Sequence, residues 1–279
     1  MTFSAGHWLI SGASSGLGLA LCEAALASGG RVSAGARSSQ ALDNLKVLGA
    51  NPLALDVTQP ASIEAAAMAA ETAHGPIDVL VNNAGVGLLS SVEAASDAEV
   101  RALFDINFFG LAALTRAVLP SMRGRRRGAI INISSVAGLC ANPGSSYYCA
   151  SKFAVEGLSE ALRGEVAPFG IHVMVVEPGA FRTNFSGNAQ MHAARHIDDY
   201  QGLMEQRRKL NAELHGNQAG DPRRGAKAIV AALDRPSPPR QLPLGGSVVA
   251  RTIRKWHDQI ASFESEAGVA AGADVPPGA

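Results

Sequence analysis

The chain has 279 residues, of which 47% are hydrophobic and 17% charged, and its 24 basic side chains balance 24 acidic ones. Soluble proteins average roughly 25% charged residues, so this composition predicts a globular protein with a large buried core. The zero net charge excludes any evident nucleic-acid or anionic-membrane footprint. The uncharged runs at 1–22 and 128–151 are interrupted by glycines, serines, asparagines or prolines, so neither is expected to span a membrane.

Cysteines are sparse, and only Cys22, Cys140 and Cys149 occur. Three cysteines cannot make a disulfide framework, and none of them has the Cys-x-x-Cys spacing of a metal site. The sequence therefore predicts no metal site and a reducing, cytoplasmic location.

Short β-rich apolar segments alternate with longer segments rich in Ala and Leu along the chain. This pattern is typical of a parallel sheet covered by helices on both faces. Six strands are expected, at 7–11, 31–36, 52–55, 79–82, 129–134 and 172–177. The predicted fold class is α/β, a single Rossmann-like domain with a doubly wound parallel sheet.

Several helix ends carry their own signals. The helix expected at 16–28 stops at Gly29 and Gly30, which suit a left-handed cap. Ser96 and Glu99 form a capping box that opens a long helix ending near Leu119. The pair Asp221–Pro222 opens a helix at 222–233.

The predicted domain organisation depends on two segments that interrupt the alternation of short strands and longer helices. Residues 1–266 are expected to form one catalytic domain that binds a dinucleotide. Within it, 184–220 is too long for an ordinary connection and is a candidate lid or substrate loop, and 236–266 forms a C-terminal extension whose last helix covers about 248–266. The tail 267–279 consists mainly of Gly, Ala and Pro and is expected to be disordered.

A glycine-rich turn follows the first strand and opens a helix, with the spacing Gly-x-x-x-Gly-x-Gly. Glycines let the backbone approach a pyrophosphate, and the N-terminus of the helix attracts its charge. Alone, the turn could be only a tight βα connection. Polar or glycine-containing clusters at the ends of three further strands, which meet at the same sheet edge, favour a ligand site. The predicted cofactor residues here are Gly12, Ser14, Ser15, Gly16, Leu17, Gly18, Asn83, Ala84, Gly85, Pro178 and Gly179.

The choice of nicotinamide cofactor is read from the end of the second strand. In an NAD site, a carboxylate about 20 residues beyond the glycines accepts hydrogen bonds from the ribose hydroxyls. No Asp or Glu occurs at 24–42 in this sequence. Arg37 and Ser38 stand there instead and suit a ribose phosphate, so NADP(H) is predicted in preference to NAD(H). The alternative is that Arg37 is merely solvated. Asp56, with its neighbour Val57, either accepts from the adenine amino group or makes a turn.

Tyr148 and Lys152 lie four residues apart at the start of a predicted helix and therefore share one face. A neighbouring ammonium lowers the pKa of a phenol, which otherwise is about 10. Such a pair is usually just two surface neighbours, but Ser135 ends a strand at the same edge and can polarise a carbonyl. Asn107 sits among apolar residues in the long helix, either as a buried amide needing a partner or as a structural, helix-bending residue.

This combination of motifs resembles the short-chain dehydrogenase/reductase family over residues 10–183. The resemblance implies that Tyr148 is the catalytic acid/base, and that Lys152 lowers its pKa and binds the nicotinamide ribose. It implies that Ser135, rather than the neighbouring Ser134, positions the substrate oxygen, and that Asn107 anchors a water in a proton relay. Thr183 matches the residue near the nicotinamide carboxamide.

The resemblance implies an oxidoreductase that interconverts a small ketone or aldehyde and its alcohol. The alternatives are a nucleotide-binding sensor or scaffold without turnover and a lyase of related fold. Residues 139–146 and 184–220 are expected to line the substrate pocket, but Met191, His192, His196, Tyr200 and Met204 fit amphipathic lid helices equally well. The stretch 242–245 resembles bacterial ketoreductases and retinol or hydroxysteroid dehydrogenase-like members. A homodimer or homotetramer through the helices at 96–119 and 148–166 is also expected.

Overall fold

The computed structural model describes residues 2–187 and 189–275. Its centre is a seven-stranded sheet in the order β3-β2-β1-β4-β6-β7-β9, in which every neighbouring pair runs parallel. The predicted α/β class and doubly wound sheet are confirmed. The strands are β1 (His7–Ile10), β2 (Arg31–Ala36), β3 (Asn51–Ala54), β4 (Val79–Asn82), β6 (Gly128–Ile133), β7 (Ile171–Pro178) and β9 (Gln241–Leu244).

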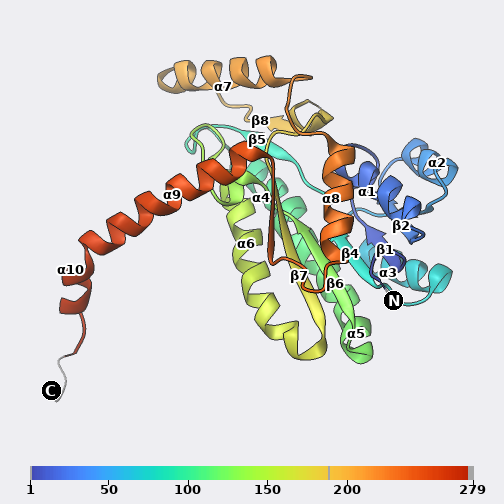
Figure 1. Cartoon of the computed structure of the whole chain (residues 1–279). Helices are drawn as coiled ribbons and strands as arrows, with labels where there is room; N and C mark the ends of the chain where they lie inside the picture. Colours follow the sequence, from blue (N-terminus) through green and yellow to red (C-terminus); the bar gives the residue numbers. More distant parts are fainter. Residues whose placement is uncertain (1, 188, 276–279) are drawn as a thin grey trace.

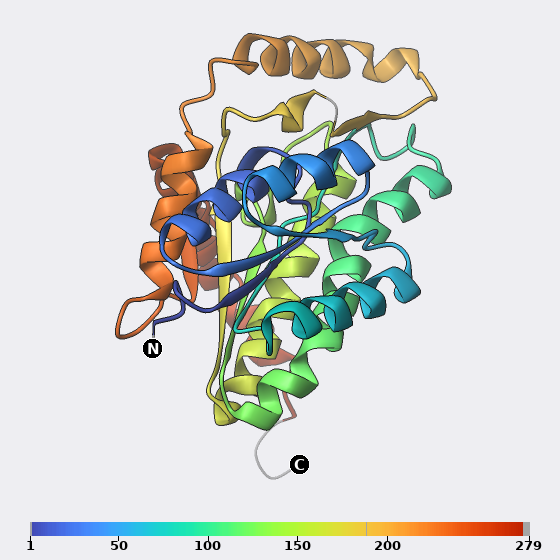
Figure 2. The same cartoon turned by 90° about the vertical axis from the view of Figure 1, so that its right-hand side faces the viewer.

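Helices cover both faces of the sheet (Figure 2). On one face lie α1 (Gly16–Ala27), α2 (Ser39–Val47) and α8 (Pro222–Leu233), of which α1 and α8 pack closely together. On the other face lie α3 (Pro60–His74), α4 (Asp97–Phe104), the π-helix η1 (Asp105–Gly110), α5 (Leu111–Arg125) and α6 (Ser146–Val166).

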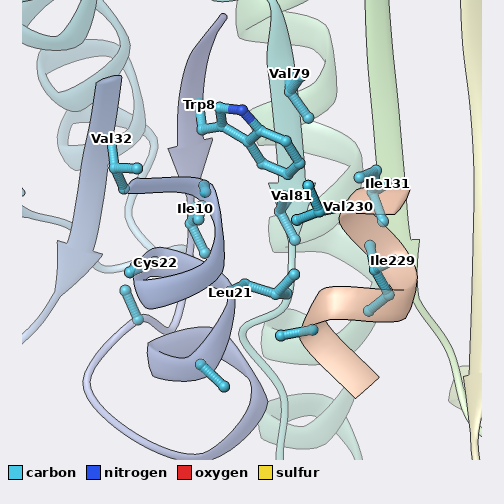
Figure 3. Packing of buried hydrophobic residues seen from close by; sticks show 14 of the residues in the cluster. Trp8, Ile10, Leu21, Cys22, Val32, Val79, Val81, Ile131, Ile229 and Val230 are labelled. Atoms are coloured by element: carbon cyan, nitrogen blue, oxygen red, sulfur yellow. The ribbon is translucent and has the colours of Figure 1, made fainter. Parts of the chain in front are cut away.

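Successive strand residues point to opposite faces and so build two separate cores. In β1, Trp8 and Ile10 belong to the core under α1 and α8, whereas Leu9 belongs to the core under α3 and α5. Figure 3 shows the first core, where Ile229 and Val230 of α8 meet residues of β1, β4 and β6. Trp8, Leu9, Ile10 and Ile229 are fully buried, and Val230 is nearly so. The near-continuous apolar strands are what a sheet buried on both faces requires.

The long helix begins with the predicted capping box, in which the Ser96 hydroxyl accepts from the Glu99 backbone amide at 3.3 Å. It was expected to end near Leu119 and instead runs through Pro120 to Arg125. The reason is that its buried stripe continues to Met122, which packs into the second core. By length and composition the helix Asp97–Arg125 would suit a membrane span, but its apolar face here lies on the sheet.

Most of the remaining elements lie in the two segments that interrupt the alternation of strands and helices, the one after β7 and the C-terminal extension. A second, two-stranded sheet pairs β5 (Gly87–Leu89) with β8 (Gln190–His192), and neither strand was predicted. The segment after β7 contains α7 (Gln201–Leu214), and the C-terminal extension contains α9 (Gly246–Ser265). The prediction of a disordered tail is wrong for α10 (Ala267–Gly272), which is helical; 276–279 lie outside the described residues. Short turns of helix are η2 (Val136–Gly138), η3 (Ala167–Phe169), η4 (Asn184–Ser186) and η5 (Asp198–Tyr200).

Candidate active site

The candidate site lies at the edge where the parallel strands end. β1 lies between β2 and β4, so the chain leaves β1 toward one side of the sheet and later returns on the other side. A crevice opens at such a reversal point, outside the carboxyl ends of the strands. The segments that follow β1, β4, β6 and β7 all reach this edge, as the sequence predicts.

The glycine turn after β1 has a backbone that only glycine accepts. Gly12 and Gly16 have positive φ angles of 63° and 58°. A Cβ on Gly18 would lie 2.4 Å from both the Asn83 side-chain nitrogen and the Gly12 carbonyl oxygen. Ser15 precedes α1 without a hydrogen bond from its side chain to the helix, so this side chain leaves the first amides of α1 available to a ligand.

Asn83 locks the ends of β1 and β4 together. Its side-chain nitrogen donates to the carbonyls of Ser11 at 3.0 Å and Gly12 at 2.9 Å. The Ser11 hydroxyl accepts in turn from the backbone amides of Asn83 at 3.0 Å and Ala84 at 3.2 Å. Asn83 therefore shapes the glycine turn through the backbone and not by reaching into the crevice.

The segment after β7 closes over the same turn. A Cβ on Gly16 would lie 3.3 Å from the Thr183 side chain. The Gly179 amide donates to the Leu244 carbonyl at 3.0 Å, which ties the Pro178–Gly179 corner to β9. The structure thus brings Thr183 and the glycine turn together although they lie far apart in the sequence.

The end of β2 carries the residues expected to choose the cofactor. Arg37 is exposed, and the Ser38 hydroxyl caps α2 by accepting from the Ala41 amide at 3.3 Å. Asp56 makes a turn, because its Oδ1 accepts from the amide and the hydroxyl of Thr58 at 2.9 and 2.8 Å. The Thr58 backbone bond lowers the pKa of Asp56, and the Arg37 charge lowers it further.

The neighbouring Val57 packs against the long helix. A Cβ on Gly110 would lie 2.7 Å from the Val57 carbonyl oxygen. Val57 therefore has a packing role in this structure, in addition to its place beside Asp56 at the end of β3.

Tyr148 lies half-buried at the start of α6, close to Ser135 at the end of β6. Burial raises the pKa of Tyr148 to about 12, and a hydrogen bond with the Ser135 hydroxyl opposes this shift. The sequence led us to expect that the Lys152 ammonium would lower the pKa of the phenol. In the structure burial outweighs every opposing effect, and Ser135 is the group that lowers this pKa.

Lys152 is buried one helical turn beyond Tyr148, and its ammonium donates to the Ile133 carbonyl at 2.9 Å. Burial lowers the pKa of Lys152 to about 8, while the carboxylate of Glu156 raises it. A Cβ on Gly85 would lie 3.6 Å from the ammonium and 3.3 Å from the Asn107 side-chain oxygen. Lys152, Asn107 and Gly85 therefore meet beneath the crevice.

Asn107 lies in the π-helix η1, and its amide is held by protein groups. Its oxygen accepts from the Val86 amide at 2.8 Å. Its nitrogen donates to the Val86 carbonyl at 2.9 Å and to the Ser151 hydroxyl at 3.0 Å. The side chain thus joins the end of β4 to α6, which fits the expected buried amide with a backbone partner. π-Helical turns are frequent at functional sites.

Two carboxyl groups beside the site, one half-buried and one fully buried, were missed from the sequence. Glu156 lies four residues after Lys152 on the same face of α6, and Glu177 is fully buried near the end of β7. Burial, and next the nearby Glu156, raise the pKa of Glu177 to about 8. An acidic residue within the apolar run of β7 was the signal that could have found Glu177.

The segment 184–220 lies over this edge of the sheet. Figures 1 and 2 both show α7 stretched across the end of the molecule, beside β5 and β8. A Cβ on Gly144, just before α6, would lie 3.6 Å from the Met204 sulfur. The segment therefore lies beside the loop before α6, and its role as a lid stays a prediction.

The other lid residues singled out in the sequence make surface contacts. Tyr200 donates to Glu93 at 3.3 Å, and His196 lies 3.5 Å from Asp198. Met191 and His192 belong to β8, as the outer strand of the small sheet. No group of three or more His, Cys, Asp or Glu side chains that suits a metal occurs within 2–187 and 189–275.

Comparison with known proteins identifies one family over most of these elements. The family described as short chain dehydrogenase matches residues 7–194. A 3-ketodihydrosphingosine reductase of Bacteroides thetaiotaomicron is 38% identical over 238 residues, which cover 85% of this chain and 87% of that protein.

Solved structures give the same result. A short-chain dehydrogenase from Streptomyces avermitilis is 41% identical with a TM-score of 0.90, covering 97% of this chain and 99% of its own. A Burkholderia phymatum enzyme in complex with NAD is 25% identical (TM-score 0.81; 94% and 96% covered). A Burkholderia cenocepacia enzyme in complex with NADP is 27% identical (TM-score 0.74; 95% and 98% covered).

Proposed function

The chain belongs to the short-chain dehydrogenase family, and we propose that it is an NADP(H)-dependent oxidoreductase that interconverts a ketone or aldehyde and the corresponding alcohol. The observation that carries this proposal is the meeting of Tyr148, Ser135 and Lys152 at the sheet edge that also holds the glycine turn. A nucleotide-binding protein without turnover would have no need of a phenol, a hydroxyl and a buried ammonium in this arrangement.

The residues at this edge fit a nicotinamide dinucleotide. The turn from Gly12 to Gly18 leaves a backbone cradle that side chains would fill, and α1 directs its free amides toward it. Asn83, Ala84 and Gly85 would line the middle of the nucleotide, with Thr183 near the carboxamide. When bound, the cofactor donates a hydride to the carbonyl carbon or accepts one from the alcohol.

The proton is handled by the chain itself. In reduction the Tyr148 hydroxyl donates its proton to the substrate oxygen while that oxygen is held by Ser135. The raised pKa of Tyr148 keeps the phenol protonated at neutral pH, which suits donation. The hydrogen bond with Ser135 stabilises the phenolate that remains. Lys152 holds its ammonium beneath the crevice, where it would bind the nicotinamide ribose. In oxidation the same groups act in reverse.

The preference for NADP(H) is part of the proposal. Arg37 and Ser38 stand at the end of β2, where a carboxylate would otherwise accept from the ribose hydroxyls. A guanidinium and a hydroxyl pair well with a ribose phosphate. Solved relatives bind NAD or NADP, so the family alone leaves this choice open.

One relative further supports the proposed direction of the reaction and the proposed type of substrate. The named Bacteroides relative is a reductase of a ketone on a long-chain base. Reduction of a ketone is therefore the direction we propose for this chain, with its pocket bounded by 139–146 and the lid at 184–220.

The decisive experiment follows NADPH oxidation against ketones, aldehydes, steroids and quinones, with Tyr148→Phe as the matched blank. We expect turnover that falls about 100- to 10,000-fold in Tyr148→Phe, since general acid catalysis contributes roughly 10² to 10⁴ in rate, with NADPH affinity nearly unchanged. Lys152→Ala is expected to lose both turnover and NADPH affinity. Full turnover by Tyr148→Phe would refute the mechanism, whereas NADPH binding with no turnover in either direction would favour a sensor or scaffold.

A further inference from the structure

Helix α9 leaves the body of the molecule and carries most of its length into solvent, as Figure 1 shows. Its first turns are seated, because Val248 and Thr252 are buried and the Arg251 guanidinium donates to Asn142 at 2.7 Å. Lys255 donates to the Leu139 carbonyl and lies 4.8 Å from the centre of the Phe153 ring. The remaining turns carry large apolar side chains without such seating.

These apolar side chains form a single seam, which we call the α9 stripe. Its members follow one another at intervals of four, three, four and three residues, which is the spacing of the core positions of a coiled coil. Their exposed fractions run from 43% to 78%, so the structure leaves the stripe uncovered. A shallow hollow between three of them could receive a side chain from a facing helix. The α9 stripe consists of Val249, Ile253, Trp256, Ile260 and Phe263.

The charges on α9 are divided along its length. Its first half carries Arg251, Arg254 and Lys255, while Asp258, Glu264 and the capping Glu266 stand in its second half and at its end. The sum is zero, whereas helices that lie on anionic lipid carry an excess of Lys and Arg on the polar face. A divided, balanced helix is instead complementary to an antiparallel copy of itself, because each half then faces the opposite charge.

We propose that the α9 stripe is an interface for a second copy of this chain, packed antiparallel about a two-fold axis at Trp256. In this register Val249 lies level with Phe263 of the other copy, and Ile253 lies within one residue of its Ile260. The contact is isologous, so each residue of the seam is used twice.

The contact closes by itself into a dimer. The stripe runs from Val249 to Phe263 and therefore along about 21 Å of helix, at 1.5 Å per residue step. One helix face of this length buries less area than a standard interface, which buries roughly 800 Å² per partner. We therefore expect a reversible dimer whose dissociation constant is on the order of micromolar.

Single cysteines on the full-length protein test the register. The three native cysteines are buried, which makes an added thiol the one exposed to mild oxidation. Trp256→Cys should cross-link to itself, and a mixture of Val249→Cys and Phe263→Cys chains should cross-link to each other. Chains that carry only Phe263→Cys should not cross-link to each other, because an antiparallel pair holds the two thiols at position 263 at opposite ends of the contact. Self-linking by Phe263→Cys would overturn the antiparallel arrangement.

Sedimentation measures the strength of the contact. Ile260→Glu should weaken the α9 step of association more than about 100-fold, since the new carboxylate would be buried unpaired twice. Ser262→Glu adds the same charge on the outer side of the helix and should sediment as the wild type does. NADPH turnover should survive both changes. Equal sedimentation of the wild type, Ile260→Glu and Ser262→Glu, together with no cross-link in the Trp256→Cys protein, would overturn the proposal.

A lipid surface is the competing occupant, and vesicles of phosphatidylcholine and phosphatidylserine test it. We expect the wild-type protein to stay in solution in their presence. Co-sedimentation with the vesicles that Ile260→Glu abolishes, without any cross-linked dimer, would assign the α9 stripe to membranes and overturn the second-copy interface.

Discussion

Among single residues, Glu177 is a fully buried carboxyl group that the sequence analysis did not single out. Leu242 and Gln241 are the hydrogen-bonding groups of β9 that partly oppose the effect of this burial on its pKa. A buried carboxylate in that position is costly, so the proton stays on, and the pKa rises to about 8.

The sign of the resulting pH dependence is fixed by that shift. The unfolded chain releases the proton near pH 4.5 and the folded chain near pH 8, so the folded state binds more protons between these values. Its free energy of unfolding therefore falls as the pH rises through this window. Glu177→Gln removes the titrating group and should gain stability relative to the wild type, by roughly 3 to 5 kcal/mol as the pH rises from 5 to 9.

Urea unfolding of both proteins at several pH values measures this difference. Glu165→Gln, which changes an exposed carboxyl on α6, is the matched control and should track the wild type at every pH. A stability difference between Glu177→Gln and the wild type that stays constant from pH 5 to pH 9 would contradict the protonated state of Glu177.

Residue types and spacing were enough to predict a candidate catalytic set, but they did not predict its electrostatics. Tyr148, Lys152 and Ser135 stand out in the sequence because helix periodicity and strand ends are local signals. The raised pKa of Tyr148 and the neutral Glu177 depend on burial, which arises only when distant segments pack together. For Asn107 the sequence correctly indicated a buried amide, but only the structure identifies Val86 and Ser151 as its partners.

At the level of elements, the turn between β1 and α1 is where the addition of a single methyl group, at Gly18, should disturb NADPH binding. A Cβ on Gly18 would meet the Gly12 carbonyl and the Asn83 amide at 2.4 Å, closer than side chains ever come. Gly18→Ala should therefore displace Asn83, separate the ends of β1 and β4, and weaken NADPH binding at least about tenfold, with a loss of roughly 1 to 3 kcal/mol in stability.

Gly164→Ala is the matched control, because this glycine lies inside α6 with open space around its Cβ position. Alanine there should stabilise the protein by about 0.5 to 1 kcal/mol and leave NADPH affinity unchanged. Titration of NADPH fluorescence and urea unfolding report both quantities. Wild-type affinity in Gly18→Ala would show that the turn does not approach the nucleotide.

Elements with a strong internal pattern were predicted well, and elements that need a partner were not. All six expected strands are present within one or two residues of their bounds. β9 was missed because Pro243 interrupts it, and proline is acceptable only because β9 is an edge strand beside β7. β5 and β8 have three residues each and exist only as a pair. α10 was taken for disorder because its composition is Ala and Gly.

At the scale of the whole molecule, the site is assembled from segments spread between Gly12 and Thr183. The sheet order brings them to one edge, and the glycine turn and the segment after β7 touch there. Alternating strand and helix patterns were enough to predict this convergence, since carboxyl ends of parallel strands share an edge. The position of the lid was predicted only in outline, because its contacts with the loop before α6 are irregular.

A nucleotide that contacts this many segments stabilises the whole fold, which makes cofactor choice measurable by unfolding. NADPH at 100 times its dissociation constant should raise stability by about 2.7 kcal/mol, and the melting temperature by roughly 5 to 10 °C. Because Arg37 faces the proposed ribose phosphate, NADH at the same concentration should raise it much less.

Arg37→Ala tests the origin of that preference. Loss of a charge-assisted hydrogen bond worth roughly 1.5 to 3 kcal/mol should weaken NADPH binding about 10- to 100-fold while NADH binding changes little. Arg31→Ala, at the opposite end of β2, is the matched control and should keep the NADPH shift. A larger melting shift with NADH than with NADPH in the wild type would assign the site to NAD, with Arg37 free to pair with Asp56 at the strand ends.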